Sequence, residues 1–169
     1  MIFIKITGLL LLAAAGTGCG IYAAFKLKSR AVLLESYLVF LKEVEIKVRF
    51  GQCSIEEILS SNYENEVLNF ILQDCRKNLH TDSHFSEVWI KTLSKAQSKG
   101  KLSRQEFLLF KAFADFGTSD VEGELSRLEM HRQKTEQQYE ALLKEYADKG
   151  KLYRTLGIFG GTALGLIII

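Results

Sequence analysis

Apolar residues recur at helical spacing along most of the chain, and no strand-like alternation of apolar and polar residues extends over a useful length. The first pattern runs over residues 33–48 and continues an apolar stretch at the amino terminus, which predicts one long helix. Gly51 follows this pattern and suits a left-handed helix cap. Two shorter patterns predict helices over residues 64–78 and 85–95, with Trp89 in the core.

Three Ser-x-x-Glu sequences predict further helix starts, because each matches a capping box and precedes an apolar run. They begin at Ser54, Ser103 and Ser119. The last helix is long and mostly polar, with a seam of positions four and three residues apart. These positions are Val121, Leu125, Leu128, Arg132, Thr135, Tyr139, Leu142 and Tyr146. We expect the seam to pack against the first long helix, in an all-α bundle of about six helices.

Both ends of the chain are apolar enough to predict membrane segments. Residues 6–25 carry no charge, and a helix of this length crosses a hydrocarbon layer of roughly 30 Å. The apolar carboxyl end is shorter and approaches that length only when counted from Leu152. We therefore predict an N-terminal transmembrane helix (1–26), a helical domain (27–151) and a short C-terminal transmembrane helix (152–169).

Basic residues flank both segments on the side of the helical domain. They are Lys26, Lys28 and Arg30 after the first segment, and Lys149, Lys151 and Arg154 before the second. Basic residues in short flanks remain on the cytoplasmic side of a membrane. Both ends therefore independently predict a two-pass protein of the cell membrane with a cytoplasmic helical domain.

Glycines recur every four residues in both apolar segments, at Gly16 and Gly20 in the first and at Gly157, Gly161 and Gly165 in the second. Such rows let helix backbones approach each other closely in lipid, which predicts helix packing at these positions. Glycine is also commoner in membrane helices than in soluble ones, and this explanation stays open for the first row in particular.

The charge distribution argues against nucleic acid as a partner. All 20 acidic residues lie between Glu35 and Asp148, whereas several basic residues lie outside that stretch, so the interior is net negative. The formal charge of +2 therefore arises at the membrane flanks and not on a basic surface of the folded domain. The absence of proline favours long uninterrupted helices, and three cysteines without CxxC spacing favour a reducing compartment.

No catalytic, cofactor or metal site is predicted, and no small-molecule substrate. Cys75, His80 and His84 form a conceivable metal constellation, but residues 81–83 read as a turn and no fourth ligand follows at a usual spacing. Residues 157–162 resemble a phosphate loop only superficially, because the lysine is missing and the surroundings are apolar. We therefore interpret the chain as a non-enzymatic protein.

A competing interpretation is a lipoprotein signal cleaved before Cys19. Gly16 occupies the position where the bacterial lipobox usually has Leu, Val or Ile, and the apolar run continues past Cys19 to Phe25. A cleaved signal usually ends its apolar core before the cleavage site. The alternative to the two-pass protein is thus a lipid-anchored extracytoplasmic helical interaction protein.

The whole chain resembles the stage III sporulation protein AB family, on short motifs that include Glu45, Phe50 with Gly51, Trp89, Gly117 with Asp120, and residues 156–161. The resemblance implies a helical domain similar to the platform protein F of type II secretion systems. It also implies partner binding near Glu45, Phe50, Gly51, Gly117 and Asp120. Relatives commonly carry Tyr-Gly and a Thr-Pro turn where this chain has residues 50–53.

This resemblance implies a membrane adaptor of a secretion-like channel complex required for endospore formation. Its cytoplasmic domain would lie on the mother-cell side of the outer forespore membrane and link an ATPase to membrane components. The partners expected from the resemblance are the membrane, a cytoplasmic ATPase and other components of the sporulation channel complex.

Overall fold

The computed structural model describes the backbone of residues 2–51, 54–79 and 84–168, and the side chains of 18, 22, 24–51, 54–79 and 84–149. This part of the chain forms helices and no strand, which confirms the predicted all-α class. The elements are α1 (Ile2–Arg49), α2 (Ile55–Ser60), α3 (Glu66–Asn78), α4 (Phe85–Ser98), α5 (Arg104–Lys111), the 3₁₀ helix η1 (Ala112–Asp115) and α6 (Val121–Ile168). The first and last of these six described α-helices include residues 2–26 and 152–168 of the predicted membrane segments.

The chain divides into two compact units. The first unit contains Met1–Ala31 and Glu140–Ile169, and the second contains Val32–Tyr139. In the first unit, Leu27, Ala31 and Leu142 are buried. The predicted spans lie within α1 and α6, mostly at residues whose side chains are outside the described set. Where side chains are described, no helix combines the length and the apolar character that crossing a membrane requires.

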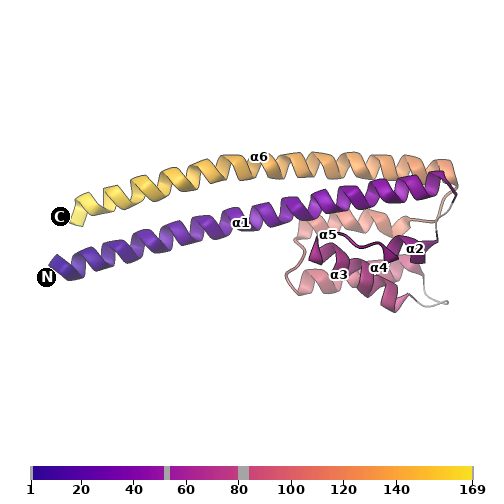
Figure 1. Cartoon of the computed structure of the whole chain (residues 1–169), viewed down its shortest axis with the longest axis horizontal. Helices are drawn as coiled ribbons and strands as arrows, with labels where there is room; N and C mark the ends of the chain where they lie inside the picture. The colour runs from indigo at the N-terminus through magenta and orange to yellow at the C-terminus, as the bar shows by residue number, and fades with distance from the viewer. Residues whose placement is uncertain (1, 52–53, 80–83, 169) are drawn as a thin grey trace. The chain divides into compact units, whose positions relative to one another are not determined.

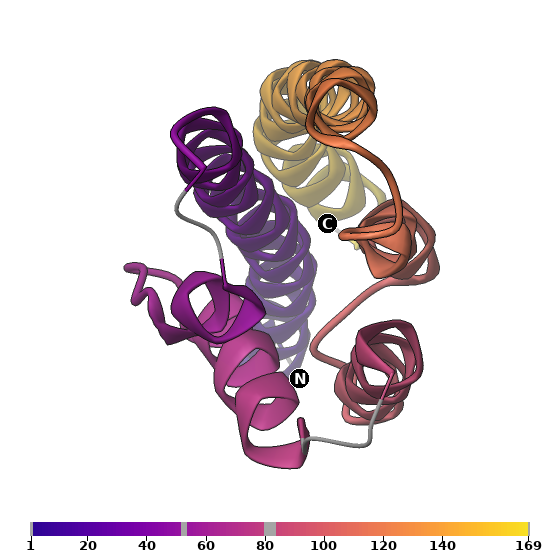
Figure 2. The same cartoon turned by 90° about the vertical axis from the view of Figure 1, so that its right-hand side faces the viewer.

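In the second unit, the short helices follow one another around the unit in chain order. Consecutive pairs from α2 to α5 are in contact, and η1 contacts both α4 and α5. Figure 1 shows these short helices grouped beside the carboxyl-terminal part of α1. Figure 2 shows the same order from α2 through α5 when the unit is viewed from its end.

Helix starts in the second unit follow the predicted caps in two of three places. Ser103 and Glu106 form a complete capping box, and the Ser54 hydroxyl accepts a hydrogen bond from the Glu57 N–H at 3.2 Å. The predicted box at Ser119 is wrong, because α6 begins one residue later. The Asp120 carboxylate accepts from the Gly123 N–H at 3.2 Å there, and a short acidic side chain at the N-cap competes with a preceding serine.

Aromatic side chains make up the centre of the second unit. Tyr37 on α1 stacks on Phe110 of α5 with ring centroids 3.8 Å apart, and Phe113 of η1 packs against Phe40 and Trp89. Trp89 is fully buried, as predicted, and its Nε1–H donates to the Phe110 carbonyl at 2.9 Å. Aromatic pairs of this kind add roughly 0.5–1.5 kcal/mol each beyond the burial of their area. The core therefore joins α1 to α4, α5 and η1.

The seam predicted for the last helix is confirmed in its middle part. Leu128, Thr135 and Leu142 are buried, whereas Val121 and Tyr146 at its two ends are exposed. Thr135 satisfies its hydroxyl by donating to the His131 carbonyl at 2.8 Å, so a polar residue is accommodated in the buried face. Glu124 and His131 on α6 are also buried, although neither residue belongs to the predicted seam.

Candidate partner-binding site

Two turns of the second unit carry four of the five predicted partner-binding residues. The first turn ends α1, where Gly51 adopts the left-handed conformation with φ of 68°, as predicted for a helix cap. Its N–H donates to the Val48 carbonyl at 3.2 Å, and the Phe50 N–H donates to the Ile46 carbonyl at 3.1 Å. The backbone of Phe50 and Gly51 is thus bonded to the last turn of α1, while the Phe50 side chain is 73% exposed. An exposed aromatic ring on a fixed turn is suited to protein contacts.

The second turn joins η1 to α6 and contains Gly117 and Asp120. Gly117 also has a positive φ, 83°, which a residue with a side chain rarely adopts. The carboxylate of Glu124 accepts hydrogen bonds from the N–H groups of Thr118 at 3.1 Å and Ser119 at 2.9 Å. These bonds satisfy the backbone of the turn and hold it against the start of α6.

The carboxyl end of α1 and the amino end of α6 lie at the same end of the second unit (Figure 1). The two turns that adjoin these helix ends therefore lie there as well. Gly117 is adjacent to the start of α2, since a Cβ atom built on Gly117 would be 4.0 Å from Ile55 Cδ1. The predicted residues Phe50, Gly51, Gly117 and Asp120 therefore belong to one end of the unit, which we call the turn surface.

Glu45, the fifth predicted residue, lies on α1 and joins an ion-pair cluster with α6. Its carboxylate is 3.1 Å from an Arg49 guanidinium nitrogen and 3.9 Å from Arg132 Nε. Arg132 also pairs with Glu129 at 2.6 Å and with Glu136 at 2.7 Å. The hydrogen bond to Glu129 is the largest cause that raises the pKa of Arg132 above its ordinary value. Glu45 is thus already paired with other residues of the chain. The ion pairs of Arg132 explain why this charged residue can interrupt the apolar seam.

A basic surface that the sequence analysis missed surrounds Phe70 of α3. The ammonium groups of Lys95, Lys99 and Lys101 lie 5.9, 5.1 and 4.5 Å from the centre of the Phe70 ring. Lys95 also pairs with Asp74 at 2.5 Å. The clustering of these lysines at the end of α4 was visible in the sequence, but their convergence on one aromatic ring depends on how α3 packs against α4.

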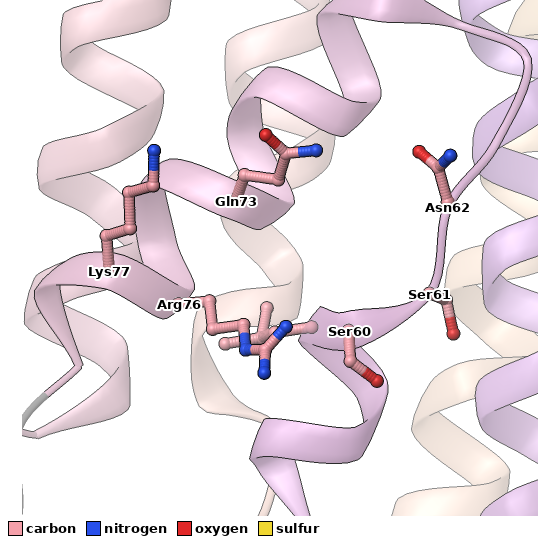
Figure 3. A pocket seen from close by; sticks show the side chains of 7 residues that line it. Ser60, Ser61, Asn62, Gln73, Arg76 and Lys77 are labelled. Atoms are coloured by element: carbon pink, nitrogen blue, oxygen red, sulfur yellow. The ribbon is translucent and has the colours of Figure 1, made fainter.

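An open pocket of about 410 Å³ lies between α2 and α3. Its described lining consists of Leu59, Ser60, Ser61, Asn62, Gln73, Arg76 and Lys77. Figure 3 shows the Arg76 side chain extending from α3 toward Ser60 at the end of α2. None of these lining residues is an acid, a histidine or a cysteine, so the lining offers no general base or thiolate ligand.

The other sequence-based candidates fall partly outside the described residues. Gly16, Gly20, Gly157, Gly161 and Gly165 lie in α1 and α6 where side-chain surroundings are not described, and His80 and the predicted turn at 81–83 are also outside. Cys75 is buried, and burial raises the pKa of its thiol to about 12. In the described part of the chain, no three His, Cys, Asp or Glu residues are grouped to hold a metal ion.

Comparison with protein-family models finds one that matches residues 5–169, described as stage III sporulation protein AB. No curated protein and no solved structure shows significant similarity to the chain. The family match covers nearly the full length, including both units and the turn surface.

Proposed function

This chain belongs to the stage III sporulation protein AB family, and on that premise we propose that it is a non-enzymatic membrane adaptor of a secretion-like channel complex. Its helical unit links a cytoplasmic ATPase to the membrane components of that complex during endospore formation. The apolar residues 6–25 and 152–169, with basic residues beside them, support placement in the membrane.

The single observation that carries the adaptor role is the turn surface with its exposed Phe50. Most protein-binding energy comes from a few residues, often aromatic, at the centre of a contact. Phe50 is 73% exposed on a backbone fixed by Gly51, and the neighbouring turn is held by Glu124. Because the backbone N–H groups of Phe50, Gly51, Thr118 and Ser119 already have hydrogen-bond partners within the chain, binding here would cost little conformational entropy.

Replacing Phe50 by Ala should weaken binding of the complex's cytoplasmic ATPase to the full-length chain by roughly 30-fold, since removal of a hot-spot side chain costs about 2 kcal/mol. The measurement is a titration of the purified ATPase against the chain in lipid nanodiscs. Leu108→Ala is the matched control, because Leu108 is 58% exposed on α5 and does not belong to the turn surface. Equal binding by the Phe50→Ala variant and the parent chain would remove the turn surface from the proposal.

Membrane topology is tested by reporters and by cysteine labelling in cells. A reporter after Ile169 should lie outside the cytoplasm, whereas one inserted at the exposed Gly100 should lie inside. Cys75 is unsuitable for labelling because it is buried, so a cysteine is introduced by Ser98→Cys, at an exposed position. Labelling of the Ser98→Cys variant in intact cells would instead favour the lipid-anchored extracytoplasmic protein.

A further inference from the structure

The end of α4 and its connection to α5 carry an excess of positive charge. Residues 94–105 contain four basic residues and no acidic one, and the three lysines among them converge on Phe70 of α3. We call these residues, Lys95, Lys99 and Lys101, the lysine cluster. Their ammonium nitrogens all lie within 5.9 Å of the centre of the Phe70 ring, and the quadrupole of an aromatic ring attracts cations. The ring thus gathers charges that repel one another.

Acidic side chains near the lysine cluster balance only part of this charge. Asp74 pairs with one member, Lys95, whereas the other two members have no ion pair with any described residue. Asp74 and Glu66 are the acids within one helical turn of Phe70 on α3. Four basic residues in 94–105 against two carboxylates leave two positive charges, which an anion from outside the chain would offset.

Aromatic contacts place the lysine cluster at the end of the second unit opposite the turn surface. Tyr37 of α1 stacks on Phe110 of α5. Three residues later along both segments, Phe40 packs against Phe113 of η1. Therefore α5 runs in the same direction as α1, and the connection that precedes α5 lies toward Val32, where α1 enters the second unit. Figure 1 shows this connection at the opposite end of the short helices from the carboxyl end of α1.

This end of the second unit is tethered close to the predicted membrane span. Val32 is the first residue of the unit and follows Lys26, the last residue of the predicted span, by six positions. Six residues reach about 20 Å even when fully extended. The Val32 end of the unit therefore stays near the end of the predicted span in any arrangement of the two units.

We propose that the lysine cluster binds the headgroups of anionic phospholipids at the cytoplasmic membrane surface. The inference rests on the proposed function, because it requires inserted spans and a cytoplasmic second unit. The cytoplasmic leaflet has a negative surface potential that attracts lysines and falls off within a Debye length, about 10 Å at 0.1 M salt. Lipid phosphate groups accept charge-assisted hydrogen bonds from ammonium groups, which the Phe70 ring holds together in this structure.

The position of the lysine cluster favours lipid over an acidic protein surface as its partner. The turn surface, where we propose ATPase binding, lies at the other end of the second unit. Anionic headgroups, in contrast, are concentrated at the surface to which the Val32 end is tethered.

Headgroup quenching in nanodiscs tests this proposal with the full-length chain. In a background in which Cys19 and Cys53 are replaced by Ser, a fluorophore is attached to the Ser98→Cys variant, beside the lysine cluster, while Cys75 stays unlabelled because it is buried. All nanodiscs contain the same low fraction of a phosphatidylcholine with a spin-labelled headgroup. Quenching should be stronger with phosphatidylglycerol present than with phosphatidylcholine alone. Salt at about 1 M should remove this difference, because the Debye length falls to about 3 Å.

Removal of two charges shows whether the lysine cluster itself causes the difference. Lys99→Gln combined with Lys101→Gln should lower quenching in phosphatidylglycerol nanodiscs to the phosphatidylcholine level. Arg76→Gln combined with Lys77→Gln is the matched control, because it removes the same charge from exposed positions near the carboxyl end of α3. The control variant should keep the full difference between the two lipids.

Equal quenching in the two lipids, or equal losses in the two double variants, would overturn the proposal and leave the lysine cluster to an acidic surface of a protein. Retention in nanodiscs separates this result from a failure of the proposed function. A chain that is not retained would refute the membrane adaptor itself, whereas a chain that is retained but quenched equally in both lipids would refute only lipid binding by the cluster.

Discussion

Glu124 and His131 are both buried on α6 and lie seven residues apart, yet their side chains differ in hydrogen bonding. The Glu124 carboxylate accepts two backbone N–H groups of the turn surface and lies 3.9 Å from Arg127. His131 packs edge-on against Tyr37, and neither His131 Nε2 nor the Tyr37 hydroxyl has a hydrogen-bond partner among the described residues. The buried Glu124 carboxylate holds a turn, whereas the buried His131 imidazole makes the stability of the core sensitive to protonation.

The largest expected effect is acid destabilisation through His131. Burial lowers the pKa of its imidazole from 6.5 to about 4, while a hydrogen bond to the Leu109 backbone opposes this shift. The unfolded chain therefore binds a proton that the folded chain excludes between these values. The contribution of His131 to the free energy of unfolding is fully present above pH 6.5 and falls by on the order of 3 kcal/mol as the pH drops toward 4.

Urea unfolding of the full-length chain in detergent micelles, measured between pH 7 and pH 4, checks this effect. His131→Phe should flatten the pH dependence in this window, because the replacement cannot bind a proton. His84→Gln is the control, since His84 is exposed at the start of α4. The same pH slope in the parent and the His131→Phe chain would assign acid sensitivity to other groups.

A smaller effect is expected when the acceptor of the turn surface is removed. Glu124→Ala leaves the Thr118 and Ser119 N–H groups without their partner and should cost about 2 kcal/mol of unfolding free energy. Glu122→Ala is the matched control on the exposed side of the same turn, where we expect a change within about 0.5 kcal/mol. Thermal denaturation compares the stability of the Glu124→Ala and Glu122→Ala variants. Equal melting temperatures would mean that Glu124 does not hold the turn.

The smallest expected effect is a gain in stability from Tyr37→Phe. The substitution removes a buried hydroxyl without a partner in the described residues and keeps the ring that stacks on Phe110. We expect stabilisation of about 1 kcal/mol. Trp89→Phe provides the opposite comparison, because it removes a donor that is satisfied by the Phe110 carbonyl and should destabilise. A loss of stability in Tyr37→Phe would show that the hydroxyl is satisfied in solution.

Much of the fold could be predicted because it follows local rules. The caps at Ser54 and Ser103 and the left-handed Gly51 depend on a few neighbouring residues. The box at Ser119 failed because Asp120 provides a competing cap one residue later. The burial of Glu124 and His131 could not be predicted, since periodicity of apolar residues gives no signal for polar residues that tertiary contacts enclose.

The candidate site was predicted only in part for a similar reason. The family resemblance pointed to Phe50, Gly51, Gly117 and Asp120, and the structure brings their turns to one end of the second unit. It did not indicate that Glu45 is already paired with Arg49 and Arg132.

Trp89 gives this chain an internal optical probe. It is the single tryptophan of the sequence, and it lies fully buried next to Phe113 with its indole N–H bonded to a backbone carbonyl. Water reaching the indole shifts its emission to longer wavelength, so intrinsic fluorescence reports directly on the integrity of the aromatic core. Unfolding of every variant above that retains Trp89 can therefore be followed without a label, in a membrane-mimetic environment where scattering obscures many other signals.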